Sequence, residues 1–179
     1  GIKPLHLNIV DGITESVRVD MGMPELSGEK IPSLMKGSPV KDCRITVEDT
    51  EYVFTLVNMG NPHAITFVKD PDSAPVTTHG PLLECDPMFP RKANIEFVQV
   101  VDQNHIRMRV WERGTGETLA CGTGASAVLV ACVLNGLTDR TAEISLPGGK
   151  LQLEWNPVDN HVYMTGPATF VYDGEWLLG

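Results

Sequence analysis

The stretch CGTGASAVLVACVLNG, residues 121–136, decides the fold class of this 179-residue chain. From Gly124 to Leu134 almost every residue is apolar, so a helix formed here has no polar face. The Asn135-Gly136 pair that follows is a typical C-terminal stop for a helix. A helix without a polar face is buried on all sides. We therefore predict a central, fully buried helix over residues 124–134.

Segments with the pattern of β-strands surround this helix in the sequence. Period-two alternation or β-branched and aromatic content marks the runs SVRVDMG, CRITVE, EYVFTLVN, HAITFVK, ANIEFVQVV, HIRMRVWE, AEISL, KLQLEW, HVYMTG and ATFVYDGEW. A weaker helix is predicted within THGPLLECDPMF, where Pro87 and Pro90 limit its length. Residues 27–42 have the composition of a surface loop. Together these patterns predict an α+β fold, with a mixed β-sheet or barrel wrapped around one buried helix.

Composition excludes several classes of function. The formal net charge is −9 with no cluster of Lys or Arg, so we expect no nucleic-acid partner. No apolar run approaches the roughly 18 residues of a membrane span, so we expect no membrane partner. The four cysteines form no CxxC pair and no zinc-like spacing with His, so we expect no metal. Free thiols predict a cytoplasmic protein.

Cys121 immediately precedes the predicted buried helix. The first N–H groups of a helix lack internal partners and lie at the positive end of the macrodipole, which lowers the pKa of a thiol there. The N–H groups of Gly122, Thr123 and Gly124 can bind an anion such as a carboxylate. A thiolate base beside a carboxylate cradle suits proton abstraction from the α-carbon of an amino acid. The alternative is a small buried cysteine that happens to precede a helix.

Polar residues at the ends of predicted strands supply further candidates. Glu112 and Arg113 close one strand, and the turn GTGETLA returns the chain to Cys121, so both should lie near the helix start. A guanidinium can bind a carboxylate in a bidentate way, and a carboxylate can bind an ammonium. Other strands begin close to Asn61, His63 and Asn94. Taken singly, each of these three residues is more often a turn former or a structural residue than a ligand.

Four strings together resemble a known family: NMGNPHAITFV, FPRKANIEFVQVVD, RVWERGTGETLACGTGASA and YMTGPATFVYDGEW. They closely resemble diaminopimelate epimerase over nearly the whole chain, with only a loose VRVDMGMPEL match in residues 1–50. The segment from Glu112 to Ala127 is the most diagnostic part. The resemblance implies an isomerase of lysine and peptidoglycan precursor biosynthesis. Such an enzyme interconverts LL- and meso-2,6-diaminopimelate without a cofactor or metal.

The resemblance also implies roles for individual residues. In this family two cysteines face the substrate α-carbon from opposite sides, one as thiolate base and the other as thiol acid, and Cys121 matches the second of them. Gly122 and Thr123 would bind the α-carboxylate through their backbone N–H groups. Glu112 and His63 would hold the α-amino group beside the reacting carbon. The distal, non-reacting end of the substrate would be bound by Asn61, Asn94 and Arg113.

One departure from the family pattern is large. The first cysteine of the family lies in a CGNG-like motif, which does not occur here. Cys43, Cys85 and Cys132 lack such a glycine-rich context and are predicted to be core or incidental cysteines. We therefore expect residues 1–179 to be the C-terminal domain of a two-domain epimerase, in which an N-terminal domain supplies the partner cysteine. Its last strands, about 161–179, are expected to pack toward that domain.

Other functions and assemblies stay open at this point. A proline-racemase-like or other cofactor-independent racemase also has a cysteine at a helix start, although the ERGTGET and NPH strings favour diaminopimelate. A phenazine-biosynthesis isomerase would lack that cysteine. A non-catalytic ligand-binding module is the alternative from a different class, because the partner cysteine is missing. We expect the isolated chain to be inactive, and a homodimer is a further alternative.

Overall fold

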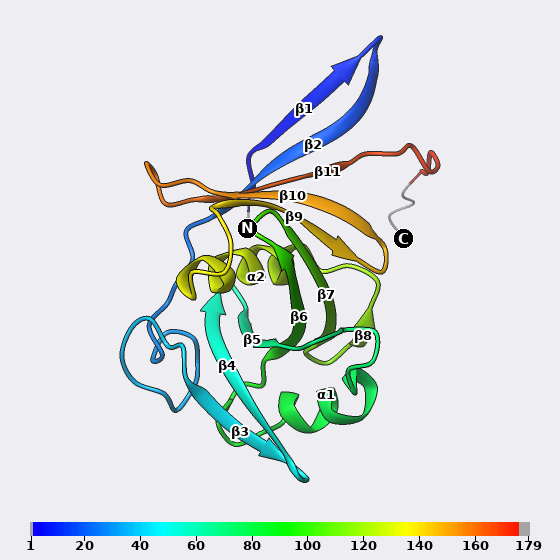
Figure 1. The fold of residues 1–179 in the computed structure, drawn as a ribbon. Coiled ribbons are helices and arrows are strands. Elements are labelled where there is room, and N and C mark those ends of the chain that lie inside the picture. Colours follow the sequence, from blue (N-terminus) through cyan, green and yellow to red (C-terminus); the bar gives the residue numbers. More distant parts are fainter. Residues whose placement is uncertain (1, 176–179) are drawn as a thin grey trace.

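The computed structural model describes residues 2–175, which form eleven strands and two helices (Figure 1). In chain order these are β1 (Leu5–Val10), β2 (Ile13–Gly22), β3 (Cys43–Val47), β4 (Thr50–Asn58), β5 (Pro62–Phe67), α1 (Val76–Glu84), β6 (Asn94–Asp102), β7 (His105–Glu112), β8 (Gly116–Thr118), α2 (Gly122–Leu134), β9 (Thr141–Leu146), β10 (Gly149–Trp155) and β11 (Val162–Pro167). All strands join one mixed sheet in the order β1-β2-β11-β10-β9-β7-β6-β5-β4-β3, with β8 paired to β7. The predicted α+β class is confirmed.

The two helices are crossover connections on opposite faces of the sheet (Figure 1). α1 joins the parallel neighbours β5 and β6, and α2 joins the parallel neighbours β7 and β9. Such crossovers are almost always right-handed. The connection from β5 to β6 and the connection from β7 to β9 advance in the same direction across the sheet, but β7 runs antiparallel to β6. The same handedness therefore places the second helix on the other face.

α2 fills the inner core, as the sequence predicts. Every residue from Gly124 to Cys132 is buried, and β9, β10 and β11 cover the side of the helix that faces away from β4–β6. Burying a side chain such as Leu129 stabilises the fold by roughly 1.5–3 kcal/mol. The helix begins two residues earlier than predicted, at Gly122. Gly136 follows its end with a φ of +68°, a left-handed conformation that suits glycine.

A second, outer core lies between α1 and the other face of β3–β6. Strand alternation separates the two cores: Phe97 of β6 packs in the outer core, and Val98 packs against α2. Residues 27–42 contain neither helix nor strand, as predicted, and Ile31 and Val40 anchor this loop in the outer core. The predicted weaker helix is confirmed as α1, although it begins at Val76 and ends at Glu84.

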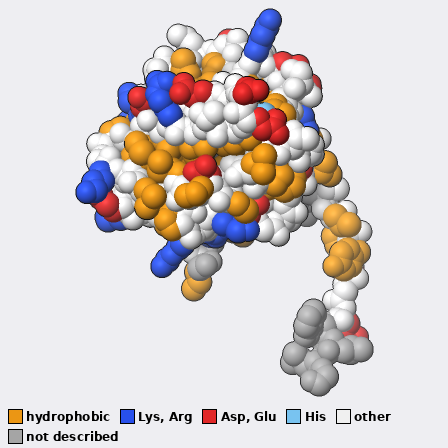
Figure 2. Space-filling model, turned by 90° about the horizontal axis from the view of Figure 1, so that it is seen from below, with side chains coloured by type: hydrophobic (Ala, Val, Ile, Leu, Met, Phe, Trp, Pro, Cys, Tyr) orange, Lys and Arg blue, Asp and Glu red, His pale blue; other side chains and the backbone are white. Residues whose placement is uncertain are grey.

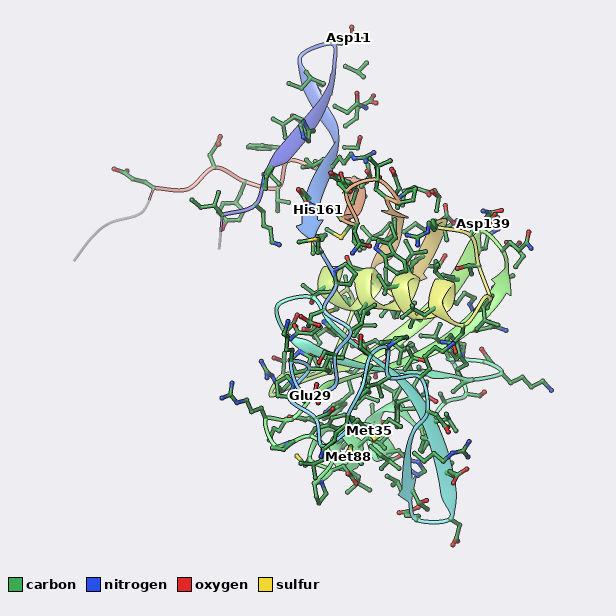
Figure 3. All side chains as sticks on the ribbon, turned by 90° about the vertical axis from the view of Figure 1, so that its left-hand side faces the viewer. Asp11, Glu29, Met35, Met88, Asp139 and His161 are labelled. Atoms are coloured by element: carbon green, nitrogen blue, oxygen red, sulfur yellow. The ribbon has the colours of Figure 1, made fainter. Side chains whose placement is uncertain are left out.

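The β1–β2 hairpin projects from the body, and Figure 3 places Asp11 at its tip. The sequence reading missed β1, although LHLNIV alternates with period two. Its apolar side chains have no core to enter: Leu5, Leu7 and Ile9 are 57%, 55% and 57% exposed. One face of this hairpin is therefore an open apolar surface in residues 2–175.

The chain leaves the sheet after β11. The predicted strand ATFVYDGEW is wrong for residues 168–175, which form neither strand nor helix, and its last residue, Trp176, lies outside the described residues. This segment extends away from the body in Figure 2, with Phe170, Val171 and Tyr172 exposed. Within residues 2–175, neither helix is long and apolar enough to cross a membrane.

Candidate active site

Sheet topology brings the predicted site residues to one edge. His63 at the start of β5 lies opposite Asn94 at the start of parallel β6, and antiparallel β7 ends at the same edge with Glu112. The chain then turns through β8 and reaches Cys121 directly before α2. Period-two alternation turns His63, Asn94 and Glu112 toward the face that carries α2. Residues from four separate segments thus surround the first turn of one buried helix.

Cys121 occupies the N-cap position of α2. Its backbone is extended, with φ −141° and ψ 104°, and its carbonyl accepts the first helical hydrogen bond from Ala125 at 2.9 Å. The thiol sulfur lies 3.5 Å from the Thr123 hydroxyl and accepts a hydrogen bond from the Gly124 N–H. Within residues 2–175 the N–H groups of Gly122 and Thr123 donate to no protein group. Both N–H groups remain available to an anion, as the sequence predicts.

The acidity of this thiol differs from the expectation. Burial raises the pKa of Cys121 to about 12, and the negative charges of Glu96 and Glu112 add to the effect against the hydrogen bonds from Thr123 and Gly124. The side chain is only 7% exposed. The Gly124 N–H lowers this pKa, as predicted for a helix N-terminus, but burial and two carboxylates outweigh it, so the expectation of a net lowered pKa is wrong for this structure. Cys121 is held as a thiol, the proton-donating form.

His63 is completely buried beneath the edge of the sheet. Its Nδ1 lies 2.6 Å from Oε1 of Glu96, and its Nε2 lies 3.1 Å from Oδ1 of Asn61. Both ring nitrogens therefore face oxygen atoms of neighbouring side chains. Asn61 is itself partly exposed.

Asn94 and Arg113 are joined by a backbone contact. The Asn94 amide donates to the Pro62 carbonyl at 2.8 Å and accepts from the Arg113 N–H at 2.9 Å, which ties the entrance of β5 to the turn after β7. The Arg113 guanidinium is exposed and donates to the Arg91 carbonyl at 3.1 Å. Glu112 accepts a hydrogen bond from the Thr118 hydroxyl across the β7–β8 hairpin. Asn94 thus holds the site together, while Glu112 and Arg113 lie closer to solvent.

The sequence reading missed Glu96, which is fully buried beside His63 and near Cys121. A signal was present, because a carboxylate stands in the apolar run of NIEFVQVV and alternation turns it to the same face as Asn94 and Val98. Buried carboxylates without a full set of partners are rare and often functional. Glu96 therefore belongs to the candidate site.

A separate surface groove of about 520 Å³ lies between β4, β5 and the loop that precedes α1. Tyr52, Phe67 and Lys69 are among its lining residues, and none of the predicted site residues is. The groove is therefore separate from the candidate site.

Comparison with solved structures defines the class of fold. A hydroxyproline epimerase from Agrobacterium vitis, solved with bound trans-4-hydroxy-L-proline, superposes with a TM-score of 0.64 at 17% identity, over 94% of this chain and 55% of that one. A phenazine biosynthesis protein from Bacillus anthracis gives a TM-score of 0.60 at 16% identity, over 99% and 66% of the two chains. The chain therefore has the fold shared by these epimerase and phenazine-biosynthesis structures, and identities this low show the fold alone.

Sequence comparison then identifies the family. The family model described as diaminopimelate epimerase matches residues 55–171. A diaminopimelate epimerase from Methanococcus maripaludis is 55% identical over 98% of this chain. The chain belongs to the diaminopimelate epimerase family. The matched region spans 63% of the length of that relative.

Proposed function

We propose that this chain forms one half of the active site of a diaminopimelate epimerase, with Cys121 as one of two acid–base thiols. The observation that carries the proposal is the position of Cys121. Its thiol caps a buried helix directly beside the unpaired N–H groups of Gly122 and Thr123. That geometry suits a group that binds a carboxylate and exchanges a proton with the neighbouring carbon. Family membership favours diaminopimelate over proline-like substrates.

The protonation state of Cys121 sets the direction of its first step. A partner thiolate removes the α-hydrogen from one face of the substrate, and the Cys121 thiol donates its proton to the opposite face, leaving a Cys121 thiolate. The reverse reaction exchanges the two roles. The backbone N–H groups stabilise the carboxylate as charge develops on the α-carbon. Glu112 binds the α-ammonium together with His63, and Asn61, Asn94 and Arg113 contact the distal end.

The partner thiol is proposed to come from a part of the protein outside these 179 residues. Cys132 lies in the buried interior of α2, and Cys43 packs in the outer core. Cys85 is exposed at the end of α1. The relative from Methanococcus maripaludis has more than a third of its length outside the matched region, and the apolar face of β1 is open. A second domain that covers this face accounts for both observations.

The test is exchange of the α-hydrogen of diaminopimelate with solvent deuterium. The complete gene product should exchange and epimerise, and Cys121→Ser should reduce both rates by at least about 100-fold, the lower range for loss of an acid–base group. Cys85→Ser is the matched control and should retain the wild-type rates. A Cys121→Ser variant with near wild-type rates would show that Cys121 is not an acid–base group.

The 179-residue chain should be assayed beside the complete gene product. We expect negligible turnover by the chain alone, because it presents one thiol at the site. If the 179-residue chain binds diaminopimelate but neither it nor the complete gene product exchanges the α-hydrogen, the ligand-binding alternative would be favoured. Robust exchange by the chain alone would mean that another thiol completes the pair.

A further inference from the structure

We propose that Glu96 is a positioning residue of this site, whose carboxylate fixes the His63 ring and places a negative charge beside Cys121. The inference deepens the proposed function and rests on it for the role of the thiol. The contacts of Glu96 carry it independently of the reaction. Glu96 stands on the inner face of β6, directly under the first turn of α2, with no exposed surface.

The Glu96 carboxylate and the Cys121 thiol both lie close to Gly124. A Cβ atom added to Gly124 would lie 3.0 Å from Oε1 of Glu96 and 3.2 Å from the sulfur of Cys121. A side chain at residue 124 would require the carboxylate or the thiol to shift by a few tenths of an ångström. The absence of a side chain at residue 124 thus lets a buried carboxylate approach the thiol.

The partners of Glu96 are incomplete. Oε1 contacts Nδ1 of His63 at 2.6 Å, whereas Oε2 is buried and has no hydrogen-bond partner within residues 2–175. A buried carboxylate of purely structural role normally has its lone pairs satisfied, because an unpaired buried charge is costly. The groups that face Glu96 are His63 on β5, Glu112 on β7 and Cys121 before α2. His63 is the one member of this set that can become a cation.

The contact between Oε1 of Glu96 and Nδ1 of His63 couples the charge of the carboxylate to the orientation of the imidazole ring. A carboxylate at Nδ1 holds the ring in one rotamer and directs Nε2 toward Asn61 and the open side of the site. The proton between Nδ1 and Oε1 decides how much negative charge remains near the sulfur. Burial raises the pKa of Glu96 against the opposing effect of His63, so proton sharing is favoured.

Glu96→Gln in the 179-residue chain tests the effect on the thiol. Glutamine keeps the shape and a hydrogen-bonding group but removes the charge. We would measure iodoacetamide alkylation of Cys121 against pH by peptide mass spectrometry, with exposed Cys85 as the internal reference. At a fixed pH near 8 the Cys121 rate should rise at least about ten-fold, the effect of one unit of thiol acidity, and Cys85 should be unchanged. Glu84→Gln, the same change in the outer core, should leave the Cys121 rate unchanged.

Nuclear magnetic resonance of the wild-type chain with ¹⁵N-labelled histidine gives a second reading that needs no variant. The His63 Nδ1 proton, in the short contact with Oε1 of Glu96, should resonate far downfield. The absence of this signal would overturn the contact. A Cys121 rate in Glu96→Gln within two-fold of wild type would overturn the effect on the thiol. If the role of Glu96 is purely structural, Glu96→Gln should lower the melting temperature and leave the pH dependence of Cys121 alkylation unchanged.

Failure of the inference and failure of the proposed function are distinguishable. If the complete wild-type protein does not exchange the α-hydrogen of diaminopimelate, the proposed function fails, and alkylation still reports on Glu96. If the wild type exchanges, Glu96→Gln should displace the pH profile of exchange in the direction of the alkylation change. An unchanged profile together with unchanged alkylation would overturn the inference alone.

Discussion

Two buried glutamates lie on opposite faces of the same sheet and have different surroundings. Glu84, at the end of α1, accepts hydrogen bonds from the Trp111 indole at 2.8 Å, the Gly114 N–H at 3.0 Å and the Lys92 ammonium at 3.2 Å. Burial opposes ionisation of Glu84, but these three bonds prevail and lower its pKa. Within residues 2–175, Glu96 has a side-chain hydrogen bond with His63 alone, and burial raises its pKa.

With the role proposed for Glu96, the difference separates a structural charge from a functional one. The bonds of Glu84 tie α1 to the turn that follows β7, so this carboxylate completes the outer core. Within residues 2–175 Oε2 of Glu96 has no hydrogen-bond partner, and its Oε1 lies close to Gly124 and Cys121, the proposed acid–base thiol. A buried carboxylate without a full set of hydrogen-bond partners is rare, and beside an ionisable group it is often functional. The following measurements test this contrast, in order of decreasing expected effect.

Replacing each carboxylate by an apolar side chain should have the largest effect. Glu84→Leu leaves three donors without their acceptor and should reduce the free energy of unfolding by about 3–5 kcal/mol. Glu96→Leu deprives only His63 and should cost about 1–3 kcal/mol. Urea denaturation of the two variants measures both values. Equal losses would mean that the two carboxylates have the same structural weight.

Two helical glycines offer a matched pair of smaller changes. A Cβ atom at Gly80 of α1 would lie 2.8 Å from Cβ and Cγ of Trp111, so Gly80→Ala should cost about 1–3 kcal/mol through overpacking. At Gly124 the close atoms are the end of Glu96 and the side chain of Cys121, which can move by a few tenths of an ångström. Gly124→Ala should change stability by less than about 1 kcal/mol, the size of the helix-propensity difference.

The same pair separates stability from thiol chemistry. Gly124→Ala should alter the pH dependence of Cys121 alkylation, because the new methyl group displaces the carboxylate or the sulfur. Gly80→Ala should not alter it. A Gly124→Ala chain with wild-type alkylation at every pH would contradict the close approach of Glu96 to Cys121.

The dependence of stability on pH should have opposite signs for the two glutamates. Glu84 has a lowered pKa, so its contribution is present above the unfolded value near 4.5 and is lost as the pH falls through the folded value. Glu96 has a raised pKa, so its contribution is present below the unfolded value near 4.5 and is lost as the pH rises through the folded value.

Denaturation of Glu84→Gln and Glu96→Gln at several pH values measures these contributions. Relative to each variant, the wild type should lose stability toward acid for Glu84 and toward neutral pH for Glu96. The same sign for both residues would contradict the contrast between a paired and an incompletely paired carboxylate.

The smallest effect should come from Lys92, the solvent-facing partner of Glu84. Its side chain is 52% exposed, and ion pairs at such positions contribute little to stability. Lys92→Met should therefore lower the free energy of unfolding less than any other change in this series. A larger loss would show that the ion pair, rather than the Trp111 and Gly114 bonds, stabilises Glu84.

Much of the fold was predictable because its signals are local. The run of apolar residues from Gly124 to Leu134 predicts a buried helix, and period-two alternation predicts most of the strands of the sheet. The exceptions have tertiary causes. β1 has an apolar pattern but no core within residues 2–175, and residues 168–175 have strand-like composition but make only one backbone hydrogen bond to β2, from Ala168 to Glu15, and form no strand. Local pattern does not say whether a neighbouring strand exists.

The sequence by itself determined the family, the position of Cys121 before a buried helix and the set of polar residues at the strand ends. Only the tertiary structure decided that Glu96 lies under that helix, that His63 is enclosed between Glu96 and Asn61, and that Cys121 is held as a thiol. The reason is that a helix N-terminus acts over one turn of contiguous chain, whereas desolvation and charge depend on what distant strands bring alongside. Here burial, together with the carboxylates of Glu96 on β6 and Glu112 on β7, raises the pKa of Cys121 by more than the backbone groups of the helix lower it.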